Sequence, residues 1–302
     1  MIALHPGLLV RLLPALLLIS TPMARAGEEL ILCGWDEVFA LKVGESDRIS
    51  TNKVWSWRAR DCPNLPEQLR DKFGSTDECK PVEGGRKILI TSSGGGVALV
   101  ERASGKALFA TFVGNAHSAE MLPRDRVVVA ASTHAEGNRL VVFDLNQPEQ
   151  AIFTTELQAA HGVVWDEKRQ VLWALGFEEL NGYRLANWAG AQPKLHMASS
   201  YPLPDSSGHD LQAAPDSDLL VLTTGSHVYV FDRERRAFFP HLTWGGKAGV
   251  KCVSIHPKTR QTAIIQASDR HWWSDTVQWL TFETALRLPG ARLYKARWCV
   301  AE

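Results

Sequence analysis

One unit of sequence recurs along this chain at a spacing that few folds accommodate. Each copy opens with a polar residue at the start of an apolar strand, and three more strands follow, separated by turns. Successive copies open 44, 48, 42 and 44 residues apart, at His117, His161, His209, Lys251 and Lys295. Units of about 40–50 residues with four strands each are typical of the blades of a β-propeller.

The turns and strands within the units support this alignment. A proline stands six residues after three of the openings and marks the same turn each time: Pro123, Pro215 and Pro257. The runs 127–131 and 219–223 are apolar throughout, as expected for strands buried on both faces. A helical period appears only weakly, over residues 66–73. The sequence therefore predicts an all-β fold.

The alignment predicts a six-bladed β-propeller. Five blades are expected at residues 53–115, 116–160, 161–207, 208–249 and 250–291. The sixth blade must be shared, because residues 293–300 form a strand with no successors and residues 30–43 lack a first strand. Pairing of these N- and C-terminal strands would close the ring and remove its open edges.

Residues 1–26 have the organisation of a secretory signal peptide. Arg11 precedes the apolar run 12–19, and Ala24-Arg25-Ala26 supplies a cleavage pattern before Gly27. The run is shorter than the roughly 20 apolar residues that span a bilayer. We therefore expect a single mature domain, residues 27–302, that is periplasmic or secreted and has no membrane segment after cleavage.

The composition of the chain restricts the classes of partner that the protein is expected to bind. Lys+Arg and Asp+Glu are equal at 33 each, and 45% of the residues are hydrophobic. Such a chain can bury a full core and lacks the positive charge of a nucleic-acid binder. We expect a monomer whose partner is a small molecule or a carbohydrate, with no nucleic acid.

Export would permit disulfides, and the chain has five cysteines. Cys62 and Cys79 lie in an insertion at about residues 60–84 that is rich in proline and charge, and a bridge would order it. Ring closure would bring Cys33 and Cys299 into neighbouring strands. The predicted pairs are Cys62–Cys79 and Cys33–Cys299, with Cys252 buried and free.

The openings of the repeats define a candidate site, because the first strand of each blade lines the channel. His117, His161, His209, Lys251 and Lys295 should therefore crowd one mouth. The sixth equivalent stays open among Trp55, Trp57 and Arg58. The loops between second and third strands should add further side chains to this mouth: Trp35, Asp36, residues 92–96, His134, Glu136, Glu178, Glu179, Tyr183, His271, Trp272, Trp273 and Asp275.

Two chemistries stay open for this mouth. In the first, His117, His161 and His209 bind a divalent metal such as Zn, Mn or Ca, with Asp36, Gln212 or water completing the shell. In the second, a histidine is the base, Tyr183 or another histidine is the acid, and Lys251 and Lys295 neutralise an anionic substrate. Both resemble, in residue type and fold, the propeller lyases that cleave uronic-acid polysaccharides. The predicted substrate-binding residues are Trp272, Trp273, Asp275, Asp36, His134 and Arg297.

Residues 85–96, 272–276 and 288–298, together with the three histidine openings, resemble an uncharacterised bacterial family of exported six-bladed β-propellers. The resemblance covers nearly the whole mature chain. It implies the fold but no reaction. Three functions stay open: a lyase or hydrolase acting on an anionic carbohydrate, a non-catalytic glycan- or ligand-binding propeller, and a protein-interaction module.

Overall fold

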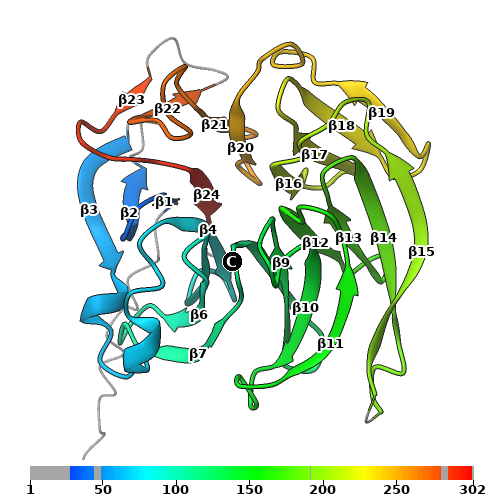
Figure 1. The fold of residues 1–302 in the computed structure, drawn as a ribbon. Helices are drawn as coiled ribbons and strands as arrows, with labels where there is room; N and C mark the ends of the chain where they lie inside the picture. Colours follow the sequence, from blue (N-terminus) through cyan, green and yellow to red (C-terminus); the bar gives the residue numbers. More distant parts are fainter. Residues whose placement is uncertain (1–27, 44–48, 191, 280–284, 301–302) are drawn as a thin grey trace, which may run out of the picture.

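The computed structural model of the chain describes residues 28–43, 49–190, 192–279 and 285–300. In these residues the strands form six four-stranded sheets around a central axis (Figure 1). This confirms the predicted six-bladed β-propeller. The expected signal peptide, residues 1–26, lies outside the described residues. No helix in the described part of the chain is long and apolar enough to cross a membrane.

Five of the blades are continuous in sequence, and each runs from the channel outward through four antiparallel strands. Blade 1 contains β4 (Thr76–Val82), β5 (Lys87–Ser92), β6 (Gly96–Glu101) and β7 (Ala107–Phe112). Blade 2 contains β8 (Ala116–Leu122), β9 (Arg126–Ala131), β10 (Arg139–Asp144) and β11 (Ala151–Glu156). Blade 3 contains β12 (Gly162–Asp166), β13 (Val171–Leu175), β14 (Glu179–Ala186) and β15 (Lys194–Pro202).

The remaining continuous blades follow the same plan. Blade 4 contains β16 (Asp210–Ala213), β17 (Leu219–Thr223), β18 (Val228–Asp232) and β19 (Ala237–Pro240). Blade 5 contains β20 (Val250–Ile255), β21 (Thr262–Gln266), β22 (Thr276–Trp279) and β23 (Leu286–Arg287). The closing blade joins the two ends of the chain, with β24 (Lys295–Cys299) innermost, followed by β1 (Glu29–Cys33), β2 (Val38–Val43) and β3 (Ile49–Trp57).

The pairing of β24 with β1 confirms the predicted closure. The two strands are antiparallel, with Leu30 opposite Trp298 and Cys33 opposite Lys295. Alternate residues of β1 then face opposite neighbours. Leu30 and Leu32 pack in the core shared with blade 5, whereas Ile31 and Cys33 pack in the core shared with blade 1. Closure therefore buries apolar side chains on both sides of one strand.

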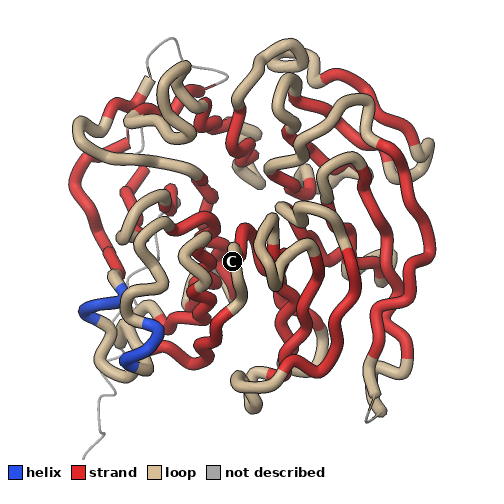
Figure 2. Tube along the Cα trace, in the orientation of Figure 1, coloured by secondary structure: helices blue, strands red, loops and turns tan. Residues whose placement is uncertain are grey.

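The first predicted blade boundary is wrong. β3 is the outer strand of the closing blade, and blade 1 begins only at Thr76. The expected insertion at residues 60–84 is instead a connection followed by β4. The connection contains the 3-10 turns η1 (Ala59–Asp61) and η2 (Glu67–Leu69). Figure 2 shows that the helical turns of the described chain are confined to this place.

The two predicted disulfides are absent, and all five cysteines are free and buried. Cys33 lies opposite Lys295 and Cys299 lies opposite Glu29, so the two cysteines stand four positions apart along the ladder. That offset is about 13 Å, beyond the roughly 7 Å that a disulfide can bridge. The Cys62 thiol contacts the carbonyl of Gly105 near the outer strands, whereas Cys79 lies on the inner strand β4.

Candidate functional site

The channel mouth is surrounded by six side chains, one from the start of each inner strand. We call them the mouth layer: Asp77, His117, His161, His209, Lys251 and Tyr294. They line a cavity of about 340 Å³ together with Ser75, Ser93, Asn115 and Trp272. The structure therefore brings together the three predicted histidines and Lys251.

A repeated backbone turn aims these side chains at the axis. A residue in the left-handed region stands two positions before four members of the mouth layer: Asn115, Ala159, Ser207 and Gly249. The turn lets the backbone carbonyl reach back to the ring that follows. The Nδ1 of His117 donates to the carbonyl of Asn115 at 3.1 Å, and the Nδ1 of His161 donates to that of Ala159 at 2.7 Å.

Three mouth-layer residues stand at interruptions of the strand ladder. The pairing of β4 with β5 skips Asp77, that of β8 with β9 skips His117, and that of β20 with β21 skips Lys251. A β-bulge of this kind redirects a side chain and is common beside functional sites. The bulges turn these side chains toward the channel mouth.

The mouth-layer side chains contact one another around the ring. The ring centroids of His117 and His161 are 4.2 Å apart, and those of His161 and His209 are 5.2 Å apart. The Lys251 ammonium donates to the Nε2 of His209 at 3.1 Å. Tyr294 packs edge-on against His117, with ring centroids 6.2 Å apart. The site is therefore one continuous polar surface.

Burial keeps the imidazoles neutral. It lowers the pKa of His117 to about 4 and holds those of His161 and His209 well below their ordinary value. Burial also raises the pKa of Asp77 to about 7, although hydrogen bonds from Ser93 oppose this shift. Desolvation likewise lowers the pKa of Lys251. At neutral pH the mouth thus combines neutral imidazoles, one ammonium group and the partly ionised carboxyl of Asp77.

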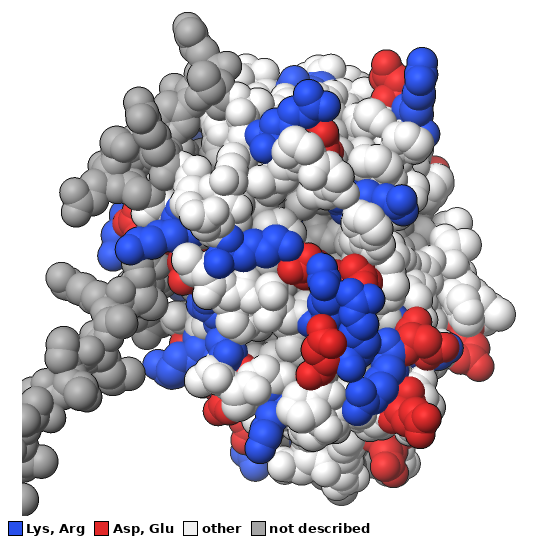
Figure 3. Space-filling model, turned by 90° about the vertical axis from the view of Figure 1, so that its left-hand side faces the viewer, with Lys and Arg blue, Asp and Glu red and all other residues white. Residues whose placement is uncertain are grey.

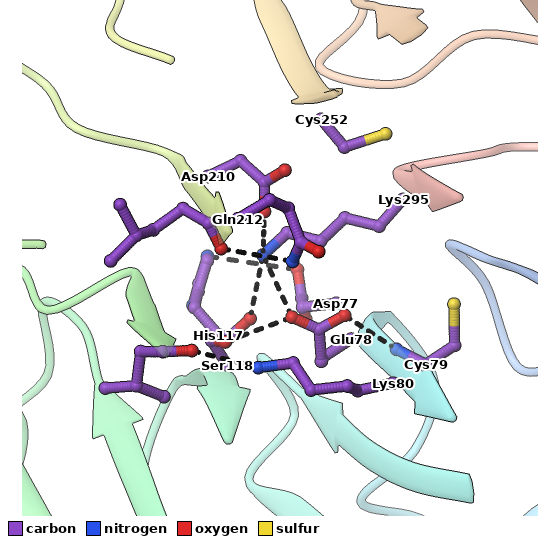
Figure 4. A network of polar contacts seen from close by, with 12 residues as sticks. Asp77, Glu78, Cys79, Lys80, His117, Ser118, Asp210, Gln212, Cys252 and Lys295 are labelled. Atoms are coloured by element: carbon purple, nitrogen blue, oxygen red, sulfur yellow. Dashed lines mark hydrogen bonds and ion pairs between the residues drawn. The ribbon is translucent and has the colours of Figure 1, made fainter. Parts of the chain in front are cut away.

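A second group of charged side chains lies directly beneath the mouth layer, and we call it the charge layer: Glu78, Asp210, Lys295 and Arg297. Lys295 is 3.2 Å from Asp210 and 3.6 Å from Glu78, and it reaches toward both across the channel (Figure 4). The guanidinium of Arg297 contacts Glu78 at 2.8 Å and Asp210 at 2.7 Å. All four side chains are at least 98% buried.

The charges of this layer compensate one another. Burial would raise the pKa of Glu78, but Arg297 and Lys295 lower it below its ordinary value. Burial would lower the pKa of Lys295, but Glu78 and Asp210 raise it. Two cations and two carboxylates therefore stay ionised inside the channel.

Lys295 and Arg297, which the sequence assigned to the site, lie in this charge layer and have no access to solvent. In the closing blade the mouth position belongs to Tyr294, the residue immediately before β24, and not to Lys295 as the repeat alignment predicts. A shift of one residue turns each strand side chain to the other side. Lys295 is therefore a buried structural cation. The prediction that it contacts a ligand is wrong, because its side chain has no solvent access.

The three histidines do not form a metal centre. No group of three His, Cys, Asp or Glu side chains within residues 28–43, 49–190, 192–279 and 285–300 is arranged to hold a metal ion. The Nδ1 atoms of His117 and His161 donate to carbonyls, and the Nε2 of His209 accepts from Lys251. A metal ion bound by three histidines needs one free nitrogen lone pair from each ring, and Lys251 already occupies that of His209.

The other predicted residues are scattered. Trp272 is 47% exposed and packs edge-on against Tyr294 at the mouth. Trp273 instead stacks on His271, and Asp275 pairs with Arg287 at 3.0 Å. His134 is exposed in the loop between β9 and β10.

Three further predicted positions lie away from the mouth cavity. Asp36 pairs with Arg60 at 3.0 Å beside a neighbouring groove. Tyr183 is buried in the core between blades 2 and 3, so it cannot act as an acid at the mouth. Gln212 lies on β16, two positions deeper than Asp210. The second-to-third-strand loops therefore contribute little beyond Trp272 and Ser93 to the mouth cavity.

Asp77 and Tyr294 are the mouth residues that sequence reasoning missed. Asp77 stands where the alignment allowed only Trp55, Trp57 or Arg58. It is the second residue of β4, within a segment that the sequence analysis assigns to an insertion. Six residues after it stands Glu83 rather than a proline, so the turn marker of the other blades is missing. The stretch Thr76-Asp77-Glu78-Cys79 before an apolar hairpin was the available signal.

The fold and the mouth define a class of protein, a six-bladed β-propeller with a polar site at one end of its channel. A family model described as a family of unknown function (DUF6528) matches residues 40–302, and the chain belongs to that family. No curated protein matches the sequence. A chain in a crystal structure of a nidogen/laminin complex is similar in fold, with a TM-score of 0.58 and 12% sequence identity. The match covers 91% of this chain and 100% of that chain, and it bears on the fold alone.

Proposed function

We propose that the channel mouth binds a small, hydroxylated organic anion of the acidic-sugar type. One observation carries the proposal: Lys251 is a partly buried ammonium group with no carboxylate partner in the described part of the chain. The deeper cations Lys295 and Arg297 are each paired with Glu78 and Asp210. An uncompensated cation in a concave site favours an anionic ligand.

The rest of the mouth suits a ligand with hydroxyl groups. Neutral imidazoles offer acceptor nitrogens, and Ser93 and Asn115 add further polar groups. The Nε2 of His209 accepts from Lys251, so its Nδ1 carries the proton, and this buried donor has no hydrogen-bond partner within the described chain. The exposed indole of Trp272 supplies an apolar face for a sugar ring.

Calorimetric titration with galacturonate tests this proposal, with galactose as the neutral counterpart. Galacturonate should bind, galactose should bind more weakly, and Lys251→Met should reduce galacturonate affinity by about tenfold, the worth of one charge-assisted hydrogen bond. Lys258→Met is the matched control, because Lys258 is exposed at the β20–β21 turn, outside the mouth. Equal affinity of wild type and Lys251→Met would refute the proposal.

A second candidate function is β-elimination from a uronic-acid polysaccharide. The observation in its favour is His161, a neutral imidazole whose Nδ1 is held by a carbonyl, so that the lone pair lies on Nε2. In this reaction the imidazole takes the C5 proton, the freed electron pair forms the C4–C5 double bond, and the C4–O bond breaks. The hydroxyl of Tyr294 would protonate the leaving oxygen.

Formation of the unsaturated product, followed by its ultraviolet absorbance, tests this second function. His161→Ala should abolish product formation while galacturonate binding at Lys251 persists. Binding without product in the wild-type protein would leave the ligand-binding function and exclude the lyase for that substrate.

We also propose that the mature protein acts outside the cytoplasm, in the periplasm or after secretion. The support is the signal-like organisation of residues 1–26. N-terminal sequencing of protein from cell fractions should find a chain that begins at Gly27 in the exported fraction. A chain that keeps Met1 in the cytoplasmic fraction would contradict this.

A further inference from the structure

A second cavity lies beside the mouth, between the closing blade and blade 5. It has a volume of about 740 Å³. One wall is the β1–β2 loop with Trp35 and Asp36, and the other is the segment 288–293 that leads into β24. The two walls touch at Gly34, where a Cβ atom would lie 2.0 Å from the carbonyl oxygen of Arg292.

Planar side chains at the edge of this groove form a stack. The guanidinium of Arg292 lies 4.3 Å from the ring centroid of Trp35 and 5.5 Å from that of Trp273. Trp273 in turn stacks on His271, with ring centroids 4.5 Å apart and planes inclined by 6°. Stacking restrains the plane of a guanidinium and leaves its in-plane N–H groups available for a carboxylate.

The charge of the groove also favours an anion. Its lining includes four cations and two carboxylates: Lys53, Arg58, Arg60, Arg292, Asp36 and Glu37. Glu37 pairs with both Lys53 and Arg58, and Asp36 pairs with Arg60. Arg292 has no carboxylate partner among the described residues. Basic and acidic side chains also lie close to one another on the side of the molecule that faces left in Figure 1 (Figure 3).

The groove and the mouth are adjoining parts of one face. Leu293 lines the groove and Tyr294, the next residue, lines the mouth. Trp272 lines the mouth, and its neighbour Trp273 faces Arg292. Each cavity holds one cation without a carboxylate partner in the described chain, Lys251 in the mouth and Arg292 in the groove. Such an arrangement matches a ligand that repeats a carboxylate along its length.

We propose that the groove is a second subsite, which binds a neighbouring acidic sugar unit of an oligosaccharide through Arg292 and Trp35. This deepens the function proposed for the mouth and rests on it for the position of the first unit. In the groove the carboxylate accepts from the guanidinium edge, and the sugar ring lies on the exposed face of the Trp35 indole, which is 41% exposed.

Titration of trigalacturonate and of monomeric galacturonate tests the subsite. Wild type should bind the trimer at least about tenfold more tightly than the monomer, since a second charge-assisted contact adds to the first. Arg292→Ala should remove this gain and leave the monomer affinity within about twofold. Arg292→Lys should restore only part of the gain, because it lacks the planar pair of donors.

Two controls make the result specific. Arg86→Ala removes an exposed arginine, 72% accessible, from the β4–β5 turn and should change neither affinity. Fully methyl-esterified trigalacturonate keeps the rings but not the charges, and it should bind no more tightly than galactose. A methyl ester that binds like the acid would overturn the role of Arg292.

The outcomes separate the two proposals. If Arg292→Ala binds the trimer like wild type while Lys251→Met weakens both ligands, the groove proposal is wrong and the mouth proposal stands. If Lys251→Met has no effect while Arg292→Ala weakens the trimer, the groove binds anionic sugars alone and the mouth proposal is wrong. If wild type binds neither acid, both are wrong.

Discussion

At the inner strands β4, β16 and β24 a mouth-layer residue is followed directly by a charge-layer residue, yet the two layers differ in how their polar groups are satisfied. In the charge layer Lys295 and Arg297 share Glu78 and Asp210, and no member reaches solvent. In the mouth layer the ammonium of Lys251 meets only a neutral imidazole. Adjacent positions thus serve different purposes: the inner charges hold blades together, and the outer groups leave bonding capacity for a ligand.

The largest effect should come from breaking the charge layer. Arg297→Met removes one partner and leaves Glu78 and Asp210 to share Lys295 in a buried setting. We expect the free energy of unfolding to fall by about 3–5 kcal/mol, the usual cost of an unpaired buried charge. Denaturant titration measures this loss. A change below about 1 kcal/mol would mean that water reaches this layer and that the comparison fails.

The sequence predicts those parts of the fold and site that depend on local patterns, and it fails for those that depend on strand register. Blade number and closure follow from local features, because each strand carries its own apolar pattern and the openings recur at a steady spacing. The identity of the residue that faces the mouth depends on register, which no local pattern fixes. Bulges turn His117 and Lys251 toward the mouth, and in the closing blade Tyr294 rather than Lys295 lines it.

The failed predictions have physical causes of the same kind. Asp77 was hidden because composition marked its segment as an insertion, although β4 begins within it. The pair Cys33–Cys299 was inferred from neighbouring strands without their register, and the register separates the two thiols. Three histidines in the same repeat position suggest a metal site, but the Nε2 lone pair of His209 is taken by Lys251, and no three metal-ligating side chains in the described residues are arranged to hold an ion.

The second-largest effect should be a dependence of the free energy of unfolding on pH, which the histidines of the mouth layer should cause. The pKa of His117 is about 4 in the folded protein against 6.5 ordinarily, and those of His161 and His209 are also lowered. Between pH 6.5 and 4 the unfolded chain binds protons that the folded protein does not. The free energy of unfolding should therefore fall as pH drops through this window, by up to about 3 kcal/mol for His117.

Denaturant titrations at several pH values measure this fall. His117→Gln removes one of the titrating groups and should make the fall shallower. A wild-type stability that is flat between pH 6.5 and 4, in a protein that remains folded, would show that the imidazoles are protonated as easily in the folded state as in the unfolded chain.

Asp77 should act in the opposite direction, and this single group should offset only part of the combined effect of the three histidines. Its pKa is about 7 in the folded protein against 3.8 ordinarily, so the folded state holds a proton that the unfolded chain has lost. As pH rises from 3.8 to 7, this group alone lowers the free energy of unfolding. Asp77→Asn removes that contribution. The rise in stability between pH 4 and 6.5 should then steepen by at most about 1.4 kcal/mol per pH unit, and an unchanged slope would contradict this.

The smallest expected change in stability is that of Lys251→Met, and it completes the comparison with Arg297→Met. Lys251 has no carboxylate partner in the described chain, and burial already disfavours its charged form, as its lowered pKa indicates. Replacement by an apolar side chain of similar length should change the free energy of unfolding by less than about 1 kcal/mol, while galacturonate affinity falls by about tenfold. Lys295→Met, at the next layer down, should lose several times more stability, because Glu78 and Asp210 would then share Arg297 alone. Denaturant titration and calorimetry on the same protein samples separate the two effects. If Lys251→Met were as unstable as Lys295→Met, the mouth lysine would belong to the structural layer, and its assignment as the anchor for an anion would be wrong.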